Sequence, residues 1–263
     1  MPPPLLPIPT LAEFLDTIKV EGLNVPPALH TTHAVNIYDI INDGGLTPPA
    51  KSNLPACCYL FVGRPAFKWE SNRSPSEFEA PLVFVFRDLS GFSIDQIHPF
   101  DTGAFESQMF PDYITKFKLE SYKLGTDSNI IGRLISAFFG TFEQYMQGNS
   151  LGEKEVTERF KLSPRHHKIR ALARLYADSD IAKFDDRAKT IEVRVTGKVD
   201  LLKVHLIGII IPHPLLADEG LLSILNTMNC VIEDYPVYPL RVDQFFALIY
   251  DRVRKIMRER AGW

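Results

Sequence analysis

The feature that most constrains the fold of this chain is a helical block that interrupts strand-like sequence. Short apolar or alternating runs, bounded by Pro, Gly or polar residues, occur on both sides of the block. These strand-like segments are 28–32, 57–62, 82–86, 190–196 and 204–211. Between them, residues 105–178 carry apolar positions at helical spacing. No long polar linker divides the chain, so we expect one α+β domain, 1–263, with the block as an insertion.

The helical pattern also predicts individual helices and one cap. The expected helices are 11–20, 34–42, 129–145, 164–178 and a closing helix at 242–260. Asp101 lies in the compact turn 99–105 and is expected to cap the helix that follows it. The helix over 129–145 has the most continuous apolar stripe, which indicates that this helix packs in the core.

Composition limits the class of protein. The 263 residues are 45% hydrophobic and 23% charged, which is ordinary for a globular protein with a large core. No apolar run approaches the roughly 18 residues of a membrane helix, and the proline-rich start lacks the pattern of a signal peptide. Cys57, Cys58 and Cys230 show no disulfide spacing, which favours a reducing environment. We therefore expect a cytoplasmic protein with no membrane partner.

Charge gives a mixed indication of partners. A net charge of −3 and a pI near 6.2 provide no overall attraction for nucleic acid. Residues 159–174 are an exception, because they form a basic stripe rich in Lys and Arg. A solvated helix face explains the same pattern. His166 and His167 in this stripe lack companion ligands at metal-binding spacing, so no metal site is expected.

Glu192 is the most informative candidate for chemistry. In the strand expected at 190–196, apolar and polar residues alternate, so Glu192 and Arg194 share one face. If this face met solvent, the two residues would be a plain surface pair. If it lined a cleft, Glu192 would provide a carboxylate for catalysis.

Three other residues extend this possibility. His30 lies in the first expected strand, Tyr59 in the second, and Arg64 directly follows the second. A histidine can bond a sugar hydroxyl, a planar guanidinium suits phosphate, and an aromatic ring can wall a pocket. Each residue also has an ordinary interpretation as a core or surface side chain. Together with a carboxylate, they are what cleavage of the glycosidic bond of NAD⁺ requires, because its transition state resembles an oxocarbenium ion.

The order of these motifs resembles that of a known family. The motifs are His30-Thr31-Thr32 with Asn36 and Gly44-Gly45-Leu46, Tyr59 with Arg64, Glu192 within Ile191 to Val195, and the run from Ile207 to Pro212. They are similar, in the same order, to motifs of the DarT-type DNA ADP-ribosyltransferase toxins of the ADP-ribosyltransferase superfamily. Two departures are that Thr31 stands where the family has an aromatic residue, and that the loop around Arg64 differs from the DNA-modifying group.

The resemblance implies a fold, a substrate and roles for residues. The fold would have two small, twisted sheets facing each other across an NAD⁺ cleft, with the helical block on one side. NAD⁺ would be the substrate, without a metal. The residues implied to bind NAD⁺ are His30, Thr32, Asn36 and Tyr59. Glu192 would be the essential carboxylate, and Arg64 would contact phosphate or assist transfer.

The segment before Glu192 corresponds to the loop that selects the target in this superfamily. Here that segment includes Asp185, Asp186 and Arg187, and Thr190 stands two residues before the glutamate. Arginine-modifying toxins have glutamate at the position of Thr190 and asparagine-modifying toxins have glutamine. Threonine therefore favours a nucleobase or another acceptor. The alternative is that residues 185–187 form a solvated acidic turn.

Three functions follow as hypotheses. The first is transfer of ADP-ribose from NAD⁺ to a macromolecule, with a base of DNA or RNA favoured and a protein acceptor as the alternative. A base acceptor would have to be single-stranded or flipped out of its stack. The second is NAD⁺ hydrolysis with water as the acceptor, and the third is a catalytically inactive module that binds NAD⁺ or a partner. An active transferase would poison its host, so the resemblance also implies a toxin or phage-defence effector with an antitoxin or inhibitor partner.

Overall fold

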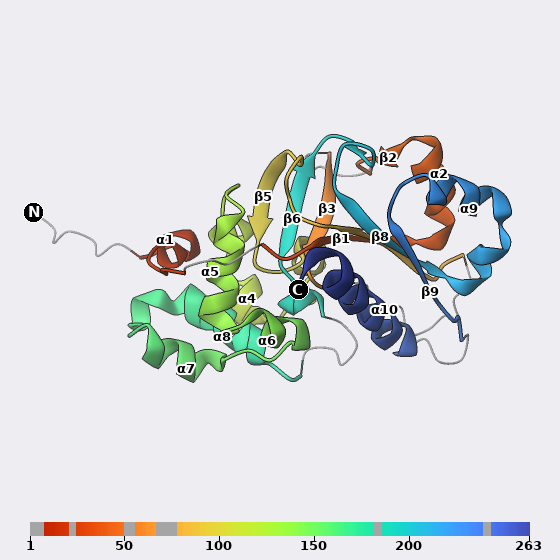
Figure 1. Cartoon of the computed structure of the whole chain (residues 1–263). Helices are drawn as coiled ribbons and strands as arrows, with labels where there is room; N and C mark the ends of the chain where they lie inside the picture. The colour runs from red at the N-terminus through yellow and green to blue at the C-terminus, as the bar shows by residue number, and fades with distance from the viewer. Residues whose placement is uncertain (1–7, 21–24, 50–55, 67–77, 181–185, 239–242) are drawn as a thin grey trace, which may run out of the picture.

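The fold is α+β, as the sequence predicts, with one large and mostly antiparallel sheet surrounded by helices (Figure 1). The computed structural model describes residues 8–20, 25–49, 56–66, 78–180, 186–238 and 243–263. Within them, seven strands form the sheet in the order β5-β6-β3-β1-β4-β8-β9, and β2 and β7 form a separate pair. The strands are β1 Ala28–His33, β2 Gly45–Leu46, β3 Cys57–Val62, β4 Pro81–Phe86, β5 Ile94–His98, β6 Glu192–Thr196, β7 Val199–Asp200, β8 Leu206–Pro212 and β9 Val231–Tyr235.

The pairing of β1 determines where this sheet opens. β1 pairs with β4 along its whole length, but it pairs with β3 only at Ala28 and Leu29. β1 and β3 therefore separate beyond Leu29. The two small facing sheets implied by the family resemblance differ from this arrangement, because the described residues form one seven-stranded sheet parted at one position. The sheet stays continuous because Ala28 and Leu29 of β1 still pair with Val62 and Phe61 of β3.

Helices fill the chain between β5 and β6. Figure 1 shows this helical block beside the β5 edge of the sheet. The α-helices of the described residues are α1 Leu11–Asp16, α2 Ile37–Asn42, α3 Thr102–Glu106, α4 Asp112–Thr115, α5 Asn129–Phe138, α6 Phe142–Gln147, α7 Gly152–Arg159, α8 His167–Ala177, α9 Glu219–Asn226 and α10 Asp243–Ile256. Shorter turns of 3-10 helix are η1 Ala34–Asn36, η2 Leu119–Tyr122, η3 Pro164–His166, η4 Arg187–Lys189 and η5 His213–Ala217, and η6 Met257–Ala261 is a π-helical turn.

The sequence predicts most of these elements but misplaces some boundaries. The single helix expected over 129–145 is two helices, α5 and α6. Gly140 has a φ of 80° after the end of α5, a left-handed conformation that stops a helix. The apolar stripe of α5 is buried as expected. The helix expected at 242–260 is α10 followed by the π-helical turn η6. Asp101 caps α3 as expected, because its side chain accepts a hydrogen bond from the amide of Ala104 at 2.6 Å.

The pattern of the sequence does not predict β5 and β9. These two strands form the two edges of the large sheet, so among the described residues each pairs with only one other strand of the sheet. β5 has the sequence Ile-Asp-Gln-Ile-His and β9 has Val-Ile-Glu-Asp-Tyr, so neither has the continuous apolar run of a central strand. The omission of β5 matters for the site, because β5 contributes His98.

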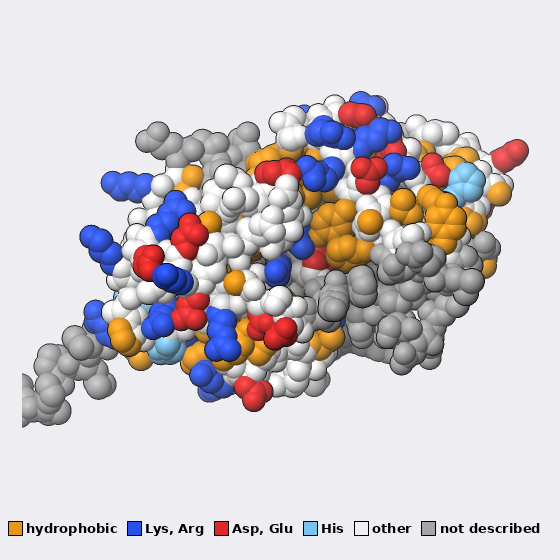
Figure 2. All heavy atoms as spheres, turned by 90° about the horizontal axis from the view of Figure 1, so that it is seen from below, with side chains coloured by type: hydrophobic (Ala, Val, Ile, Leu, Met, Phe, Trp, Pro, Cys, Tyr) orange, Lys and Arg blue, Asp and Glu red, His pale blue; other side chains and the backbone are white. Residues whose placement is uncertain are grey.

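The surface does not present a field of one charge. On the face shown in Figure 2, Lys and Arg side chains alternate with Asp and Glu side chains. The basic stripe at 159–174 is partly neutralised in the same way: Arg170 pairs with Glu153 of the neighbouring α7. In addition, Arg174 lies over the ring of Tyr113, which itself bonds Asp178. Among the described residues, no helix has the length and apolar character needed to cross a membrane.

The packing of α10 on β8 gives a test of the fold. Gly208 of β8 lies against Ile256, and a Cβ atom at position 208 would come within 2.7 Å of the Ile256 side chain. We expect Gly208→Ala to lower the free energy of unfolding by about 1–3 kcal/mol, because both residues are buried and the core has to shift. Urea unfolding of Gly208→Ala and of Gly208→Ala with Ile256→Val measures this. The second substitution should restore part of the loss, and equal losses in both variants would contradict the packing described.

Candidate functional site

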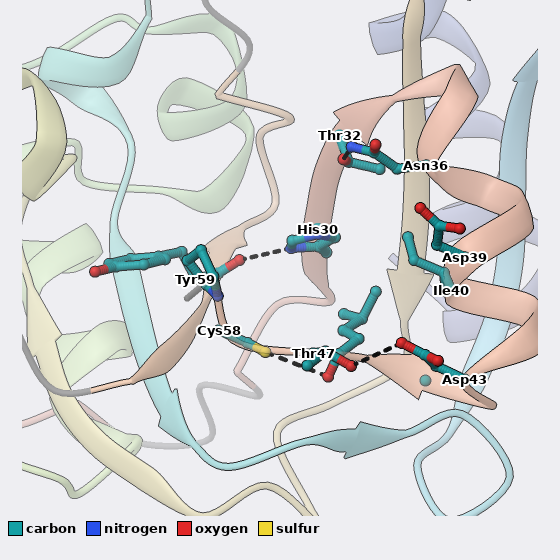
Figure 3. Close-up of a pocket in the computed structure, with 12 residues that line it drawn as sticks. His30, Thr32, Asn36, Asp39, Ile40, Asp43, Thr47, Cys58 and Tyr59 are labelled. Carbon is teal, nitrogen blue, oxygen red and sulfur yellow. Dashed lines mark hydrogen bonds between the residues drawn. The ribbon is translucent and has the colours of Figure 1, made fainter. Parts of the chain in front are cut away.

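A pocket of about 320 Å³ opens where β1 and β3 separate (Figure 3). The four residues implied to bind NAD⁺ all contribute to it, although they come from two separate segments of the chain. The lining residues are His30, Thr32, Asn36, Asp39, Ile40, Asp43, Gly45, Leu46, Thr47, Pro49, Cys58 and Tyr59. The volume is at the lower end of that of small-molecule sites, so this pocket can hold a part of a dinucleotide.

The His30 side chain forms a hydrogen bond to β3 in the region where the backbones of β1 and β3 are no longer paired. Its Nδ1 lies 2.9 Å from the carbonyl oxygen of Tyr59, on the strand from which β1 has parted. Burial lowers the pKa of His30 below its ordinary value, so the ring is neutral near pH 7. Because a carbonyl oxygen can only accept, Nδ1 carries the proton and Nε2 remains an acceptor. His30 can therefore accept a hydrogen bond from a hydroxyl group of a ligand.

The turn after β1 adds polar groups to the pocket. The side-chain amide of Asn36 donates to the hydroxyl of Thr32 at 2.7 Å, which fixes both groups at the pocket wall. Asp39 of α2 and Asp43 directly after it also line the pocket, whereas no Lys or Arg is among the lining residues that the structure describes. The sequence analysis missed these two aspartates, although both lie within seven residues of Asn36. A negative potential here disfavours phosphate and favours hydroxyls or a cationic ring.

Tyr59 does not wall this pocket with its ring, in contrast to what the resemblance implied. Figure 3 shows the ring pointing away from His30, while the backbone of Tyr59 faces the pocket. The ring instead lies beside Arg194, with the guanidinium carbon 6.0 Å from the ring centre. Tyr59 and Arg194 are direct partners in the β3–β6 register, so their side chains share a face.

Glu192 is buried at the start of β6 rather than exposed as half of a surface pair. Its side chain is 1% exposed. The amide of Thr102 donates to one carboxyl oxygen at 2.8 Å, and the Thr102 hydroxyl lies 2.8 and 3.0 Å from the two oxygens. Burial, with the nearby charge of Asp101 as a second cause, raises the pKa of Glu192 to about 8. The carboxyl group is therefore mostly protonated at neutral pH.

His98 is the main residue of this region that the sequence analysis missed. It pairs with Glu192 in the β5–β6 register and is completely buried, with its Nδ1 3.7 Å from a Glu192 oxygen. That distance is too long for a hydrogen bond. Within the part of the chain that the structure describes, neither ring nitrogen of His98 has a hydrogen-bond partner. Burial lowers the pKa of His98 to about 3, so the ring is neutral. The only sequence signal was its position next to the turn 99–105.

The three residues expected to converge do not line one hollow. The pocket includes His30, but neither Glu192 nor Arg64 is among its lining residues. β3 lies between His30 on β1 and Glu192 on β6. Across the sheet, Phe61 of β3 pairs with Glu192 on one side and with Leu29 on the other, so the residue of β1 in line with Glu192 is Leu29, the neighbour of His30.

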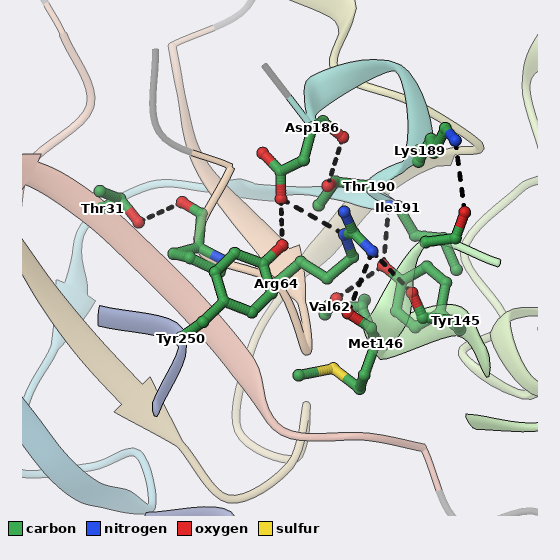
Figure 4. A network of polar contacts seen from close by, with 12 residues as sticks. Thr31, Val62, Arg64, Tyr145, Met146, Asp186, Lys189, Thr190, Ile191 and Tyr250 are labelled. Atoms are coloured by element: carbon green, nitrogen blue, oxygen red, sulfur yellow. Dashed lines mark hydrogen bonds and ion pairs between the residues drawn. The ribbon is translucent and has the colours of Figure 1, made fainter. Parts of the chain in front are cut away.

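Arg64 lies at the centre of a buried network instead of binding in the pocket (Figure 4). Its Nε is 3.3 Å from Asp186, and its Nη1 donates to the carbonyl of Tyr145 at 2.6 Å. The hydroxyl of Tyr250 bonds the same carboxylate. Tyr145 in turn donates its hydroxyl to the carbonyl of Val62 at 2.7 Å. Arg64 therefore joins the end of β3 to the helical block, the segment before β6 and α10.

The residues expected to select a target are mostly buried. Asp185 lies outside the described residues. Asp186 and Arg187 are 6% and 7% exposed, so they do not form a solvated acidic turn. Thr190 is completely buried, and its hydroxyl donates to the carbonyl of Asp186 at 2.8 Å. Thr190 therefore cannot contact an acceptor directly in this conformation.

Comparison with known protein families and curated proteins does not assign this chain to a family. No protein-family model and no curated protein matches this chain. Within the part that the structure describes, no group of three or more His, Cys, Asp or Glu side chains is placed to hold a metal ion.

The protonated state of Glu192 predicts a dependence of stability on pH. The ordinary pKa is 4.5 and the pKa in the folded protein is about 8. Between these values only the folded state keeps the proton, so the free energy of unfolding should fall as pH rises from about 4.5 to 8, by on the order of a few kcal/mol. Glu192→Gln should remove this part of the slope, whereas the exposed Glu155→Gln should leave it. Urea unfolding from pH 5 to 8 measures both, and parallel slopes would contradict the assignment.

The Arg64–Asp186 pair predicts a large effect on stability. Asp186→Asn leaves the guanidinium buried without its counter-charge, so we expect the free energy of unfolding to fall by about 3–5 kcal/mol. Asp16→Asn is the matched control, because Asp16 pairs with Arg133 but is 66% exposed. That change should cost less than about 1 kcal/mol. Chemical unfolding of the two variants measures the difference, and similar small losses in both would show that the buried pair does not stabilise the fold.

Proposed function

We propose that this protein binds NAD⁺ and transfers its ADP-ribose group to a macromolecular acceptor, with Glu192 as the essential carboxylate. The observation that carries the proposal is the placement of the predicted residues on three neighbouring strands. His30 is on β1, Tyr59 on β3 and Glu192 on β6. Two strand spacings are roughly 10 Å, a separation that one dinucleotide can span.

The pocket beside β1 is suited to the nicotinamide ring of NAD⁺. Because Glu192 does not line this pocket, the proposal requires the attached ribose to leave the pocket toward β6. The nicotinamide ring of NAD⁺ is cationic, and Asp39 and Asp43 give the pocket two carboxylates, with no Lys or Arg among its described lining residues. The free Nε2 of His30 and the amide of Asn36 can bond ribose hydroxyls or the carboxamide. The same charges disfavour the pyrophosphate, which would extend out of the pocket.

The carboxyl group of Glu192 is proposed to stabilise the positive charge that develops on the ribose during the reaction. As nicotinamide leaves, the bond from the ribose carbon to the ring nitrogen breaks and the electron pair departs with nicotinamide, so the ribose becomes oxocarbenium-like. A carboxylate near that centre stabilises it. A cation that approaches Glu192 lowers the raised pKa of the carboxyl group, which then ionises and releases its proton to solvent. Thr102 already provides two hydrogen-bonding groups that can hold the ionised form.

The acceptor is proposed from the sequence resemblance. That resemblance favours a base of DNA or RNA, and a protein side chain or water is the alternative. The basic stripe at 159–174 gives little support to a nucleic acid, because several of its cations have internal partners. By the same resemblance, we propose a toxin or defence effector with an inhibitor protein as partner.

The experiment is incubation with NAD⁺ labelled in its adenylate part, together with separate pools of DNA, RNA and protein. We expect label to enter one pool and to fall at least 100-fold with Glu192→Gln, because the stabilising charge is lost. Glu155→Gln is the matched control, since Glu155 is an exposed residue of α7. Nicotinamide release without labelling would identify hydrolysis instead. Equal labelling by Glu192→Gln and the native protein would refute the role of Glu192.

A second function is favoured by one specific observation. Glu192 and Arg64 are both buried and both held by internal partners, Thr102 and Asp186, in the structure described. This arrangement favours a module that binds NAD⁺ without turning it over. In that case titration calorimetry would show NAD⁺ binding that His30→Ala abolishes, while no nicotinamide would be released by the native protein.

A further inference from the structure

A second pocket, of about 490 Å³, lies at the end of β4 and the start of β8. Three basic residues line it: Arg87 directly after β4, His205 directly before β8, and Arg260 in the turn η6. Thr227 and Asn229, between α9 and β9, add polar groups. None of these residues takes part in the proposed transfer of ADP-ribose.

The fold brings these distant residues together by identifiable contacts. The β4–β8 register shifts between Val85 and Phe86, an irregularity that redirects the chain just before Arg87. The amide of Arg87 then donates to the carbonyl of His205 at 2.8 Å. Gly208 lets Ile256 approach β8 closely, which carries η6 and Arg260 toward the same end of the sheet.

The charges of this pocket are not balanced by its own residues. Arg87 and Arg260 are exposed, and neither has an ion pair or hydrogen bond from its side chain within the described part of the chain. By contrast, Arg252 and Arg254 on the preceding helix both pair with carboxylates. The third basic residue, His205, lies 3.1 Å from the carboxylate of Asp88, which is not itself a lining residue. Two guanidinium groups around one cavity favour an anion that accepts bidentate hydrogen bonds.

Apolar groups of the same pocket indicate more than a bare anion. Leu202 is 83% exposed, and it lines the pocket together with Leu206, Ile207 and Met228. The cavity is larger than a phosphate group needs and falls within the range of small-molecule sites. We propose that this pocket is a second ligand site that binds a nucleotide unit, with its phosphate on Arg87 and Arg260 and its base or sugar on the apolar side. The unit can be a free nucleotide or part of a single-stranded nucleic acid.

The test is fluorescence anisotropy with two probes, a labelled AMP and a labelled single-stranded oligonucleotide, without NAD⁺. We expect Arg87→Gln with Arg260→Gln to weaken binding of the recognised probe at least tenfold. If the oligonucleotide binds, the slope of log affinity against log salt should fall in magnitude by about 0.7, the contribution of the one phosphate that both arginines hold. Arg258→Gln is the matched control, because Arg258 is exposed in the same turn but does not line the pocket.

Each outcome of this binding experiment either supports or overturns the proposed second site. Loss of binding in the double variant, with binding kept in Arg258→Gln and an unchanged circular dichroism spectrum, supports the site, and the probe that binds identifies the source of the nucleotide. No binding of either probe by the native protein, or equal binding by the double variant, would overturn it. Competition by inorganic phosphate as strong as that by unlabelled AMP would overturn the assignment to nucleotides. Because NAD⁺ is absent, failure here leaves the proposed function unaffected.

Discussion

The incomplete pairing between β1 and β3 is the constraint on which the site depends. A sheet that stayed fully paired at this position would leave no gap for the His30 ring, which now bonds the Tyr59 carbonyl in place of a β1 amide. The opening is tolerated because β1 is paired along its whole other edge with β4, so the strand keeps most of its hydrogen bonds. The pocket is therefore a consequence of strand pairing and not of a loop added to the surface.

The buried network around Arg64 holds the parts of the molecule that surround this opening. It connects β3, the helical block, the segment before β6 and α10, which are far apart in sequence. A buried charge needs its partner, so these four parts have to assemble together. This gives Arg64 a structural role. A guanidinium held in this way contributes to a site by fixing the ends of β3 and β6.

The sequence predicts elements with a strong apolar period and fails where the signal is weak or non-local. β1, β3, β4, β6 and β8 follow from their apolar runs, and Asp101 follows from its place before a helix. The edge strands do not, because their exposed sides carry polar residues, and His98 was missed with β5. Likewise, the alternating pattern showed that Glu192 and Arg194 lie on the same face of the strand, but it did not show which residues cover Glu192. Burial under Thr102 depends on a turn 90 positions away in the chain, which no local pattern encodes.

The two pockets have opposite charge. The first carries Asp39 and Asp43, whereas the second, at the end of β4, carries Arg87 and Arg260. The pockets adjoin at one place, because the amide of Leu201, which lines the second, donates to the carbonyl of Gly44, between Asp43 and Gly45 of the first. Coulomb attraction and repulsion would therefore sort ligands by charge, with a cationic ring directed to one pocket and phosphates to the other. A protein with a net charge of only −3 can discriminate in this way because local fields, and not the overall charge, act within a Debye length. The overall pI consequently says little about which pocket a charged ligand meets.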